Sequence, residues 1–230
     1  MDRTEREATW TDGVRAVSPI LLGVVPFGLI FGVTAANADV PILATWASSF
    51  IVFAGASQIA LVEVMDGGGA AFIAVLTAII INARHLMYSA DMGRYTANEP
   101  LTSKLGAAYL LTDQAYLVTT HRFPDPSNAT GSVRFYVAAG LTLWATWQMT
   151  TTTGILLGAA IPASWSLEFA IPLTFIALLV LAVKDKPGLV AAVIGGSVAV
   201  AAVGLPYHLG LLVGTASGIA AGMTAEGWLE

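Results

Sequence analysis

The chain has 230 residues and a formal net charge of −5; 56% of its residues are hydrophobic and only 11% are charged. A soluble domain carries about 25% charged residues, so this composition excludes an ordinary water-soluble globule and favours a protein embedded in a bilayer. The basic residues do not cluster, which argues against nucleic acid as a partner, and the absence of cysteine excludes disulfides and thiolate metal sites.

Apolar segments recur along the whole chain, and a helix needs about 20 apolar residues to span a membrane. The segments are 13–36, 41–64, 69–90, 105–121, 134–161, 167–184, 188–204 and 207–225. We expect an all-α, polytopic integral membrane protein with about seven to eight helical segments, some of them broken. One membrane transport domain over 1–230 would begin with a polar tail over 1–12.

The first segment contains GVVPFGLIFG near its middle. Pro26 lacks a backbone N–H and is expected to break or kink the helix there. Backbone groups freed by a break need partners, so irregular backbone in a membrane survives where it is buried in protein or lines a cavity. Pro26 and Phe27 are therefore candidate substrate-binding residues.

Two glycine motifs, 28–32 and 154–158, read GLIFG and GILLG. Their likeness leaves two interpretations open. One is an internal repeat with the binding site between two halves, and the other is close packing of helix backbones through small residues.

Basic residues indicate which loops face the cytoplasm. The residues that agree with a cytoplasmic N-terminus are Arg3, Arg6, Arg15, Arg122, Arg134, Lys184 and Lys186. Arg94 and Lys104 fall on the other side if every segment crosses the membrane once. We therefore favour at least one irregular segment, re-entrant or broken, in the first part of the chain.

The second segment pauses at FAGASQ, Phe53 to Gln58. Gly55 weakens a helix, and Ser57 and Gln58 offer hydrogen bonds. Half-helix ends at such a pause present N–H or C=O groups to a ligand. Gly55, Ser57 and Gln58 are candidate substrate-binding residues, with ordinary polar packing between helices as the alternative.

The third segment ends in INARHLMYSAD. On one continuous helix Asn82 and His85 would share a face, and Arg84 would lie opposite with Asp91. One face could line a cavity while the other forms a salt bridge, so Asn82 and His85 are candidate substrate-binding residues. The alternative is that Arg84 anchors at the membrane surface beside Tyr88.

The fourth segment places Asp113 in LGAAYLLTDQAYLVTT, among apolar or weakly polar residues. A lone carboxylate there is either paired with a base such as Arg84 or protonated part of the time, as a proton-coupled carrier requires. We assign Arg84 and Asp113 as a proton-coupling or charge pair, with a static structural pair as the alternative.

The fifth segment carries Trp147 and Gln148 near its middle. Tryptophan usually marks the membrane–water interface, but in mid-segment beside a glutamine it can line a pocket. Trp147 and Gln148 therefore join the candidate substrate-binding residues.

Sequence patterns of enzymes are absent. The three histidines are scattered, no HExxH spacing occurs, and neither a phosphate loop nor a Gly-x-Ser-x-Gly elbow is present. We predict no catalytic residues, no metal and no cofactor.

The motifs that hold these candidates resemble the AzlC family, the large subunit of branched-chain amino acid exporters. The resemblance rests on GVVPFGLIFG, SSFIVFAGASQIALVEVMDGGG, LTAIIINARHLMYSADM and LTDQAYLVT. In the last motif the family more often has Glu where this chain has Gln114.

The resemblance implies proton-coupled export of branched-chain or similar apolar amino acids across the cytoplasmic membrane. It also implies a small AzlD-like membrane partner and leaves open a homo-oligomer of that heterodimer. A channel and an assembly subunit without its own substrate site remain alternatives, and a membrane-embedded enzyme is the least favoured.

Overall fold

The computed structural model describes residues 7–158, 183, 185–205 and 209–229, and every regular element in these ranges is helical.

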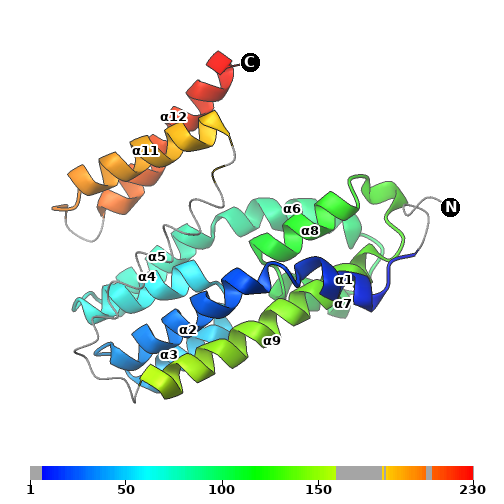
Figure 1. Cartoon of the computed structure of the whole chain (residues 1–230), viewed down its shortest axis with the longest axis horizontal. Helices are drawn as coiled ribbons and strands as arrows, with labels where there is room; N and C mark the ends of the chain where they lie inside the picture. The colour runs from blue at the N-terminus through cyan, green and yellow to red at the C-terminus, as the bar shows by residue number, and fades with distance from the viewer. Residues whose placement is uncertain (1–6, 159–182, 184, 206–208, 230) are drawn as a thin grey trace. The chain divides into compact units, whose positions relative to one another are not determined.

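The chain divides into two compact units, 1–167 and 168–230, which are considered separately (Figure 1). The first unit contains α1 (Trp10–Val17), α2 (Leu21–Asn37), α3 (Ile42–Ile51), α4 (Gly55–Asp66), α5 (Ala71–Asn82), α6 (Arg84–Tyr95), α7 (Leu101–Tyr109), α8 (Asp113–Arg122), a 3₁₀ turn (Pro126–Asn128) and α9 (Ser132–Gly158). The second contains α11 (Lys186–Ala201) and α12 (Leu209–Leu229). A single transport domain over the whole chain stays a prediction.

Helix α1 begins within the range 1–12 that was predicted to be a polar tail. Its first residue is Trp10, and the preceding Thr9 caps it through its hydroxyl and backbone N–H, which both donate to Asp12. A capping box of this kind satisfies donors at a helix start.

Two pairs of consecutive helices form bent rods. The axis bends by 68° between α1 and α2 and by 44° between α5 and α6. Pro19 has no N–H with which to continue α1, which explains the first break. The predicted break at Pro26 is wrong, because α2 runs through this residue without interruption.

In the described ranges, no single helix has both the length and the apolar character of a membrane span. Taken together, α1 with α2 and α5 with α6 meet both requirements. The all-α prediction is confirmed for the described residues, which form eleven α-helices where the sequence predicted about seven to eight segments.

Helices α3 and α4 form a hairpin that reverses direction at residues 52–54. Across the hairpin, the amide nitrogen of Gln58 donates to the hydroxyl of Ser48 at 3.0 Å. At its base, the backbone N–H of Asp39 donates to the Asp66 carboxylate at 2.6 Å. Segment 41–64 is broken, as its sequence suggested, but both of its ends lie at the same end of the unit (Figure 1). The segment therefore folds back on itself.

Helices α7 and α8 form a second hairpin, which reverses at residues 110–112. Five residues connect α6 to α7, and the hydroxyl of Tyr95 at the end of α6 donates to the carbonyl of Phe123, just after α8, at 2.6 Å. Both ends of this hairpin therefore lie beside the end of α6. Segment 105–121, which we expected to be one continuous helix, also folds back on itself.

The two hairpins enter the unit from opposite ends. Helices α5 and α6 run from the base of the first hairpin to the base of the second (Figure 1). The chain thus repeats one order of elements, a bent pair followed by a hairpin, in α1–α4 and again in α5–α8 with reversed direction. Transporters are often built from inverted repeats of this kind.

The glycine motifs belong to one interface and do not form this repeat. A Cβ added at Gly32 would lie 2.7 Å from the Cα of Gly154, and one added at Gly158 would lie 2.9 Å from the Cα of Val33. Helices α2 and α9 therefore approach closely through small residues, which favours the packing interpretation.

The second unit is a hairpin of α11 and α12 with the same kind of contact. A Cβ at Gly195 would lie 3.2 Å from the Cα of Gly218, and one at Gly214 would lie 2.6 Å from the Cβ of Ala199. Predicted segments 188–204 and 207–225 correspond to these helices, whereas segment 167–184 lies almost wholly outside the described residues.

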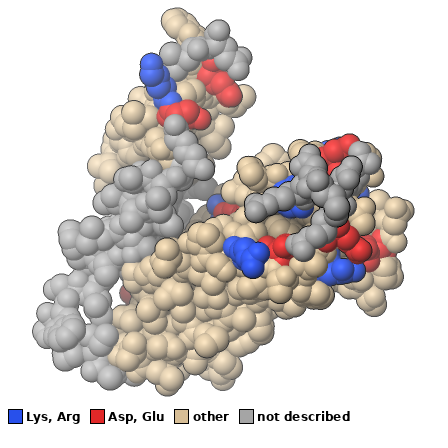
Figure 2. All heavy atoms as spheres, turned by 45° about the vertical axis from the view of Figure 1, so that its right-hand side comes forward, with Lys and Arg blue, Asp and Glu red and all other residues tan. Residues whose placement is uncertain are grey.

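Basic residues of the first unit gather where the N-terminus lies. The ion pair between Arg134 and Glu7, at 3.1 Å, places the start of α9 beside the start of the chain. Figure 2 shows charged residues toward this end and a broad uncharged surface beside it. Arg94, Lys104 and Arg122 are at the bases of α6, α7 and α8, so the second hairpin brings them to the N-terminal end as well. The opposite end, residues 38–41 and 66–70, contains no Lys or Arg.

Candidate functional site

The tips of the two hairpins meet in the middle of the first unit. The hydroxyl of Tyr109, at the end of α7, donates to the carbonyl of Phe50 in α3 at 2.8 Å and accepts from the indole of Trp144 at 2.8 Å. Phe53, buried in the first tip, has a φ of 42°, a left-handed conformation that is strained for a bulky residue. Strained backbone of this kind is concentrated at functional sites.

The break between α5 and α6 lies at the same depth. Each helix has 12 residues, which corresponds to a length of about 18 Å on either side of the break. Arg84 begins α6 and Asp113 begins α8, so both charges lie far from the two ends of the unit.

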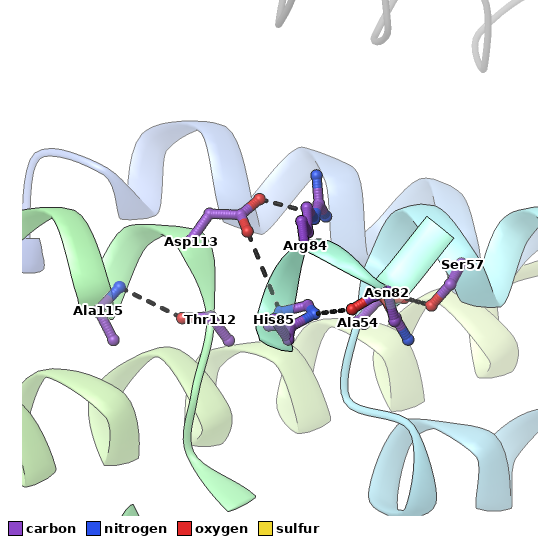
Figure 3. Close-up of polar contacts among 8 residues, drawn as sticks. All are labelled: Ala54, Ser57, Asn82, Arg84, His85, Thr112, Asp113 and Ala115. Atoms are coloured by element: carbon purple, nitrogen blue, oxygen red, sulfur yellow. Dashed lines mark hydrogen bonds and ion pairs between the residues drawn. The ribbon is translucent and has the colours of Figure 1, made fainter. Parts of the chain in front are cut away.

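A charged cluster occupies this position. The guanidinium Nη2 of Arg84 lies 3.2 Å from Oδ2 of Asp113, and Nε2 of His85 lies 4.0 Å from Oδ1 (Figure 3). Nδ1 of His85 lies 3.2 Å from the backbone carbonyl of Asn82. The predicted division of Asn82 and His85 from Arg84 onto opposite faces is wrong, because the helix breaks at Ala83 and both basic side chains reach one carboxylate.

The two ring nitrogens of His85 face different acceptors. A carbonyl only accepts, so a hydrogen bond between Nδ1 and Asn82 requires a hydrogen on that nitrogen. The other nitrogen, Nε2, faces the Asp113 carboxylate, which the Arg84 guanidinium also contacts.

Helices α6 and α8 also contact through residues that we had not assigned to the site. The rings of Tyr88 and Tyr116 stack with centroids 4.5 Å apart, and the Tyr116 hydroxyl donates to Asp91 at 3.0 Å. Tyr116 follows Asp113 by three residues, which places both on one face of α8. The sequence spacing could have predicted this contact between α6 and α8, because Tyr88 and Asp91 follow Arg84 at similar intervals.

The first hairpin brings a second polar group beside the charged cluster. Helices α4 and α5 are an antiparallel pair of equal length, so the start of α4 lies beside Asn82 at the end of α5 (Figure 3). The hydroxyl of Ser57 donates to the carbonyl of Ala54 at 2.9 Å and is therefore already used. In α4 no side chain caps the first backbone N–H groups, which begin at Gly55.

A cluster of three aromatic rings, those of Phe27, Phe31 and Trp147, packs against the start of α4. The ring of Trp147 stacks with Phe31 at a centroid distance of 5.8 Å and contacts Phe27 at 5.5 Å. A Cβ at Gly55 would lie 2.6 Å from both Phe27 and Trp147, so only glycine fits. Pro26 is exposed on α2 and does not join this group.

Buried polar atoms without a partner are concentrated among these residues. In the described part of the chain, six buried side-chain atoms make no hydrogen bond: Oε1 of Gln58, Oδ1 of Asn82, Oδ1 of Asp113, Nε1 of Trp147, Oε1 of Gln148 and Oγ1 of Thr151. Such atoms are uncommon in folded proteins and call for an explanation. Thr151 was not among our predicted site residues, although it shares a stripe of α9 with Trp147.

The described residues contain no group of three or more His, Asp or Glu side chains arranged to hold a metal ion. Their chemistry at the hairpin tips is that of ion pairing and hydrogen bonding.

Charged and polar side chains enclosed by apolar helices are characteristic of α-helical membrane proteins, in which an internal charge indicates a functional site. A family model described as AzlC protein matches residues 19–161, which is more than half of the chain. The chain belongs to the AzlC family.

Two relatives support placement in a membrane. The chain is 24% identical to "Inner membrane protein YgaZ" of Escherichia coli K12 over 96% of its own length and 92% of that protein. It is 28% identical to "Uncharacterized membrane protein" of Archaeoglobus fulgidus over 99% of each chain. No solved structure matches the chain.

Proposed function

We propose that this chain is the large subunit of a secondary transporter that exports branched-chain or similar apolar amino acids. Export crosses the cytoplasmic membrane, is coupled to protons and requires a small AzlD-like membrane partner. The heterodimer is the working unit, with further association of heterodimers left to experiment.

One observation carries this proposal: two hairpins from opposite ends meet at an Arg84–Asp113–His85 cluster at mid-depth. Irregular backbone at such depth needs protein partners or a ligand, and transporters place substrates where broken helices meet. A channel, by contrast, needs no ion pair between the starts of two half-helices.

The amino acid substrate matches the groups at the hairpin tip. The uncapped backbone N–H groups at the start of α4 suit the substrate carboxylate, because a helix N-terminus carries a partial positive charge. The rings of Phe27, Phe31 and Trp147 suit an aliphatic side chain.

Proton coupling is assigned to the charged cluster. Protonation of Asp113 removes the partner of Arg84, and protonation of His85 adds a second cation to the same carboxylate. Either event changes the interaction between α6 and α8. It therefore shifts the preferred position of the second hairpin, α7–α8, relative to the bent pair α5–α6.

Charge distribution supports a cytoplasmic N-terminus. Arg94, Lys104, Arg122 and Arg134 all lie at the N-terminal end, and the opposite end carries Asp39 and Asp66. Positive residues are enriched on the cytoplasmic side. The re-entrant hairpins thus remove the conflict that Arg94 and Lys104 pose for a series of single spans.

The test is counterflow of labelled leucine in proteoliposomes that contain the chain with its co-expressed partner. We expect saturable exchange that a proton gradient accelerates, and no exchange from the partner alone. Non-saturable flux would indicate a channel. Exchange that persists unchanged when this chain is omitted would make it an assembly subunit.

A further inference from the structure

Two buried glutamines direct their amide nitrogens at the same short piece of α3. Nε2 of Gln58 donates to the hydroxyls of Ser48 and Ser49, each at 3.0 Å. Nε2 of Gln148, on α9, donates to the backbone carbonyl of Ser49 at 2.9 Å. Gln58 is fully buried and Gln148 is 7% exposed, so water is largely excluded from both amides.

The orientation of both amides follows from their partners. The carbonyl of Ser49 only accepts, so Gln148 must present its nitrogen there. The Ser48 hydroxyl donates its hydrogen to the carbonyl of Thr45 at 2.6 Å, so it accepts from Gln58. The carbonyl oxygens of both glutamines consequently point away from α3, and neither has a hydrogen-bond partner among the described residues.

This orientation defines what Gln58 can offer a ligand. We predicted Gln58 as a substrate-binding residue because its amide offers hydrogen bonds, but its donor is occupied and its unpaired atom is an acceptor. Gln148 is in the same state, so the junction of α3, α4 and α9 contains two acceptors that lack donors.

A third oxygen lies on the same face of α9. Thr151 follows Gln148 by one helical turn and is fully buried, and its hydroxyl makes no hydrogen bond in the described part of the chain. The hydroxyls of its neighbours Thr150 and Thr153 donate to backbone carbonyls one turn earlier. Thr151 therefore differs from the other threonines of this run.

We propose that Oε1 of Gln58, Oε1 of Gln148 and Oγ1 of Thr151 form a site for a small monovalent cation, either a sodium ion or the ammonium group of an amino acid. The second source rests on the proposed export function; the first does not. Neutral amide and hydroxyl oxygens are hard ligands suited to such a cation, whereas divalent ions prefer carboxylates. In transporters with broken helices, uncharged oxygens near the break, those of backbone carbonyls, bind the coupling cation.

The chain purified in detergent tests this site through its thermal unfolding temperature. Sodium chloride is titrated against choline chloride at constant ionic strength, and leucine is titrated in the choline buffer. The acid 4-methylpentanoate, which is leucine without its amino group, is the matched ligand control. We expect saturable stabilisation by sodium or by leucine, and none by 4-methylpentanoate.

Three variants locate the effect. Gln148→Leu and the isosteric Thr151→Val each weaken half-saturation at least tenfold, because each removes one oxygen of the site. Gln114→Leu, the same substitution in the first turn of α8, leaves half-saturation unchanged. If Gln148→Leu does not fold, Thr151→Val still tests the site, because it removes a hydroxyl and keeps the shape of the side chain.

The outcomes distinguish a sodium ion from the ammonium group of an amino acid as the bound cation. Stabilisation by sodium that leucine does not alter assigns the site to a sodium ion, and stabilisation by leucine alone assigns it to the ammonium group. No saturable effect of either ligand, or wild-type half-saturation in Thr151→Val, overturns the site. Sodium stabilisation of the chain without leucine counterflow in proteoliposomes that also contain the co-expressed partner would contradict the proposed export function and leave the site standing.

Discussion

The hydroxyl of Tyr109 and the backbone carbonyl of Phe50 lie 2.8 Å apart, and this hydrogen bond joins the tips of two hairpins that enter the protein from opposite ends. The residues are 59 positions apart in the chain. Their contact creates the polar centre, because it holds the start of α4 and the start of α8 at one depth.

Tyr109→Phe removes this link while keeping the ring. The Phe50 carbonyl and the Trp144 indole each lose a partner, so we expect a loss of about 1–2 kcal/mol in unfolding free energy. Thermal and denaturant unfolding in detergent measure it. Tyr88→Phe is the matched control, because the Tyr88 hydroxyl makes no hydrogen bond among the described residues; an equal loss in both variants would argue against the link.

Asp113→Asn removes the carboxylate that Arg84 and His85 share. We expect proton-driven leucine efflux to fall at least tenfold with normal membrane insertion, because Arg84 then lacks its counter-ion. Glu99→Gln removes an acid from the connection between α6 and α7 and should leave efflux unchanged. Wild-type efflux from Asp113→Asn would exclude the cluster from coupling.

Gly154→Ala tests the close approach of α2 and α9. The new methyl group would overlap the carbonyl of Leu29, so the helices must separate and the unfolding temperature should fall by several degrees. Gly93→Ala in α6 meets nothing within 4 Å and should stabilise the protein slightly, by about 0.5–1 kcal/mol. Equal effects of the two substitutions would mean that the α2–α9 interface tolerates the extra volume.

The sequence predicted the positions of irregular backbone better than it predicted the direction of the chain after each of them. FAGASQ marked the reversal between α3 and α4, since glycine and polar residues interrupt an apolar run there. Hydrophobic periodicity does not encode direction, however, so a bent span and a re-entrant hairpin look alike. The basic residues Arg94 and Lys104 were the only signal for reversal.

Pairing at the site was predictable only in outline. The cost of an isolated charge suggested Arg84 as the partner of Asp113, and the two lie as an ion pair. The convergence of His85 on the same carboxylate depends on the break at Ala83, which no glycine or proline announces. The free carbonyl of Gln58 depends on Ser48, Ser49 and Thr45, whose joint geometry has no sequence signature.

Cysteine accessibility tests the pair of re-entrant hairpins most directly, because the chain contains no native cysteine. Single cysteines at Asp39 and Gly68 flank the first hairpin, and single cysteines at Ala97 and Thr130 flank the second. With an impermeant maleimide on intact cells, we predict labelling of the first two and protection of the last two until the cells are opened. Labelling of Asp39 and Gly68 from opposite sides of the membrane would show that segment 41–64 crosses it, and would contradict this account.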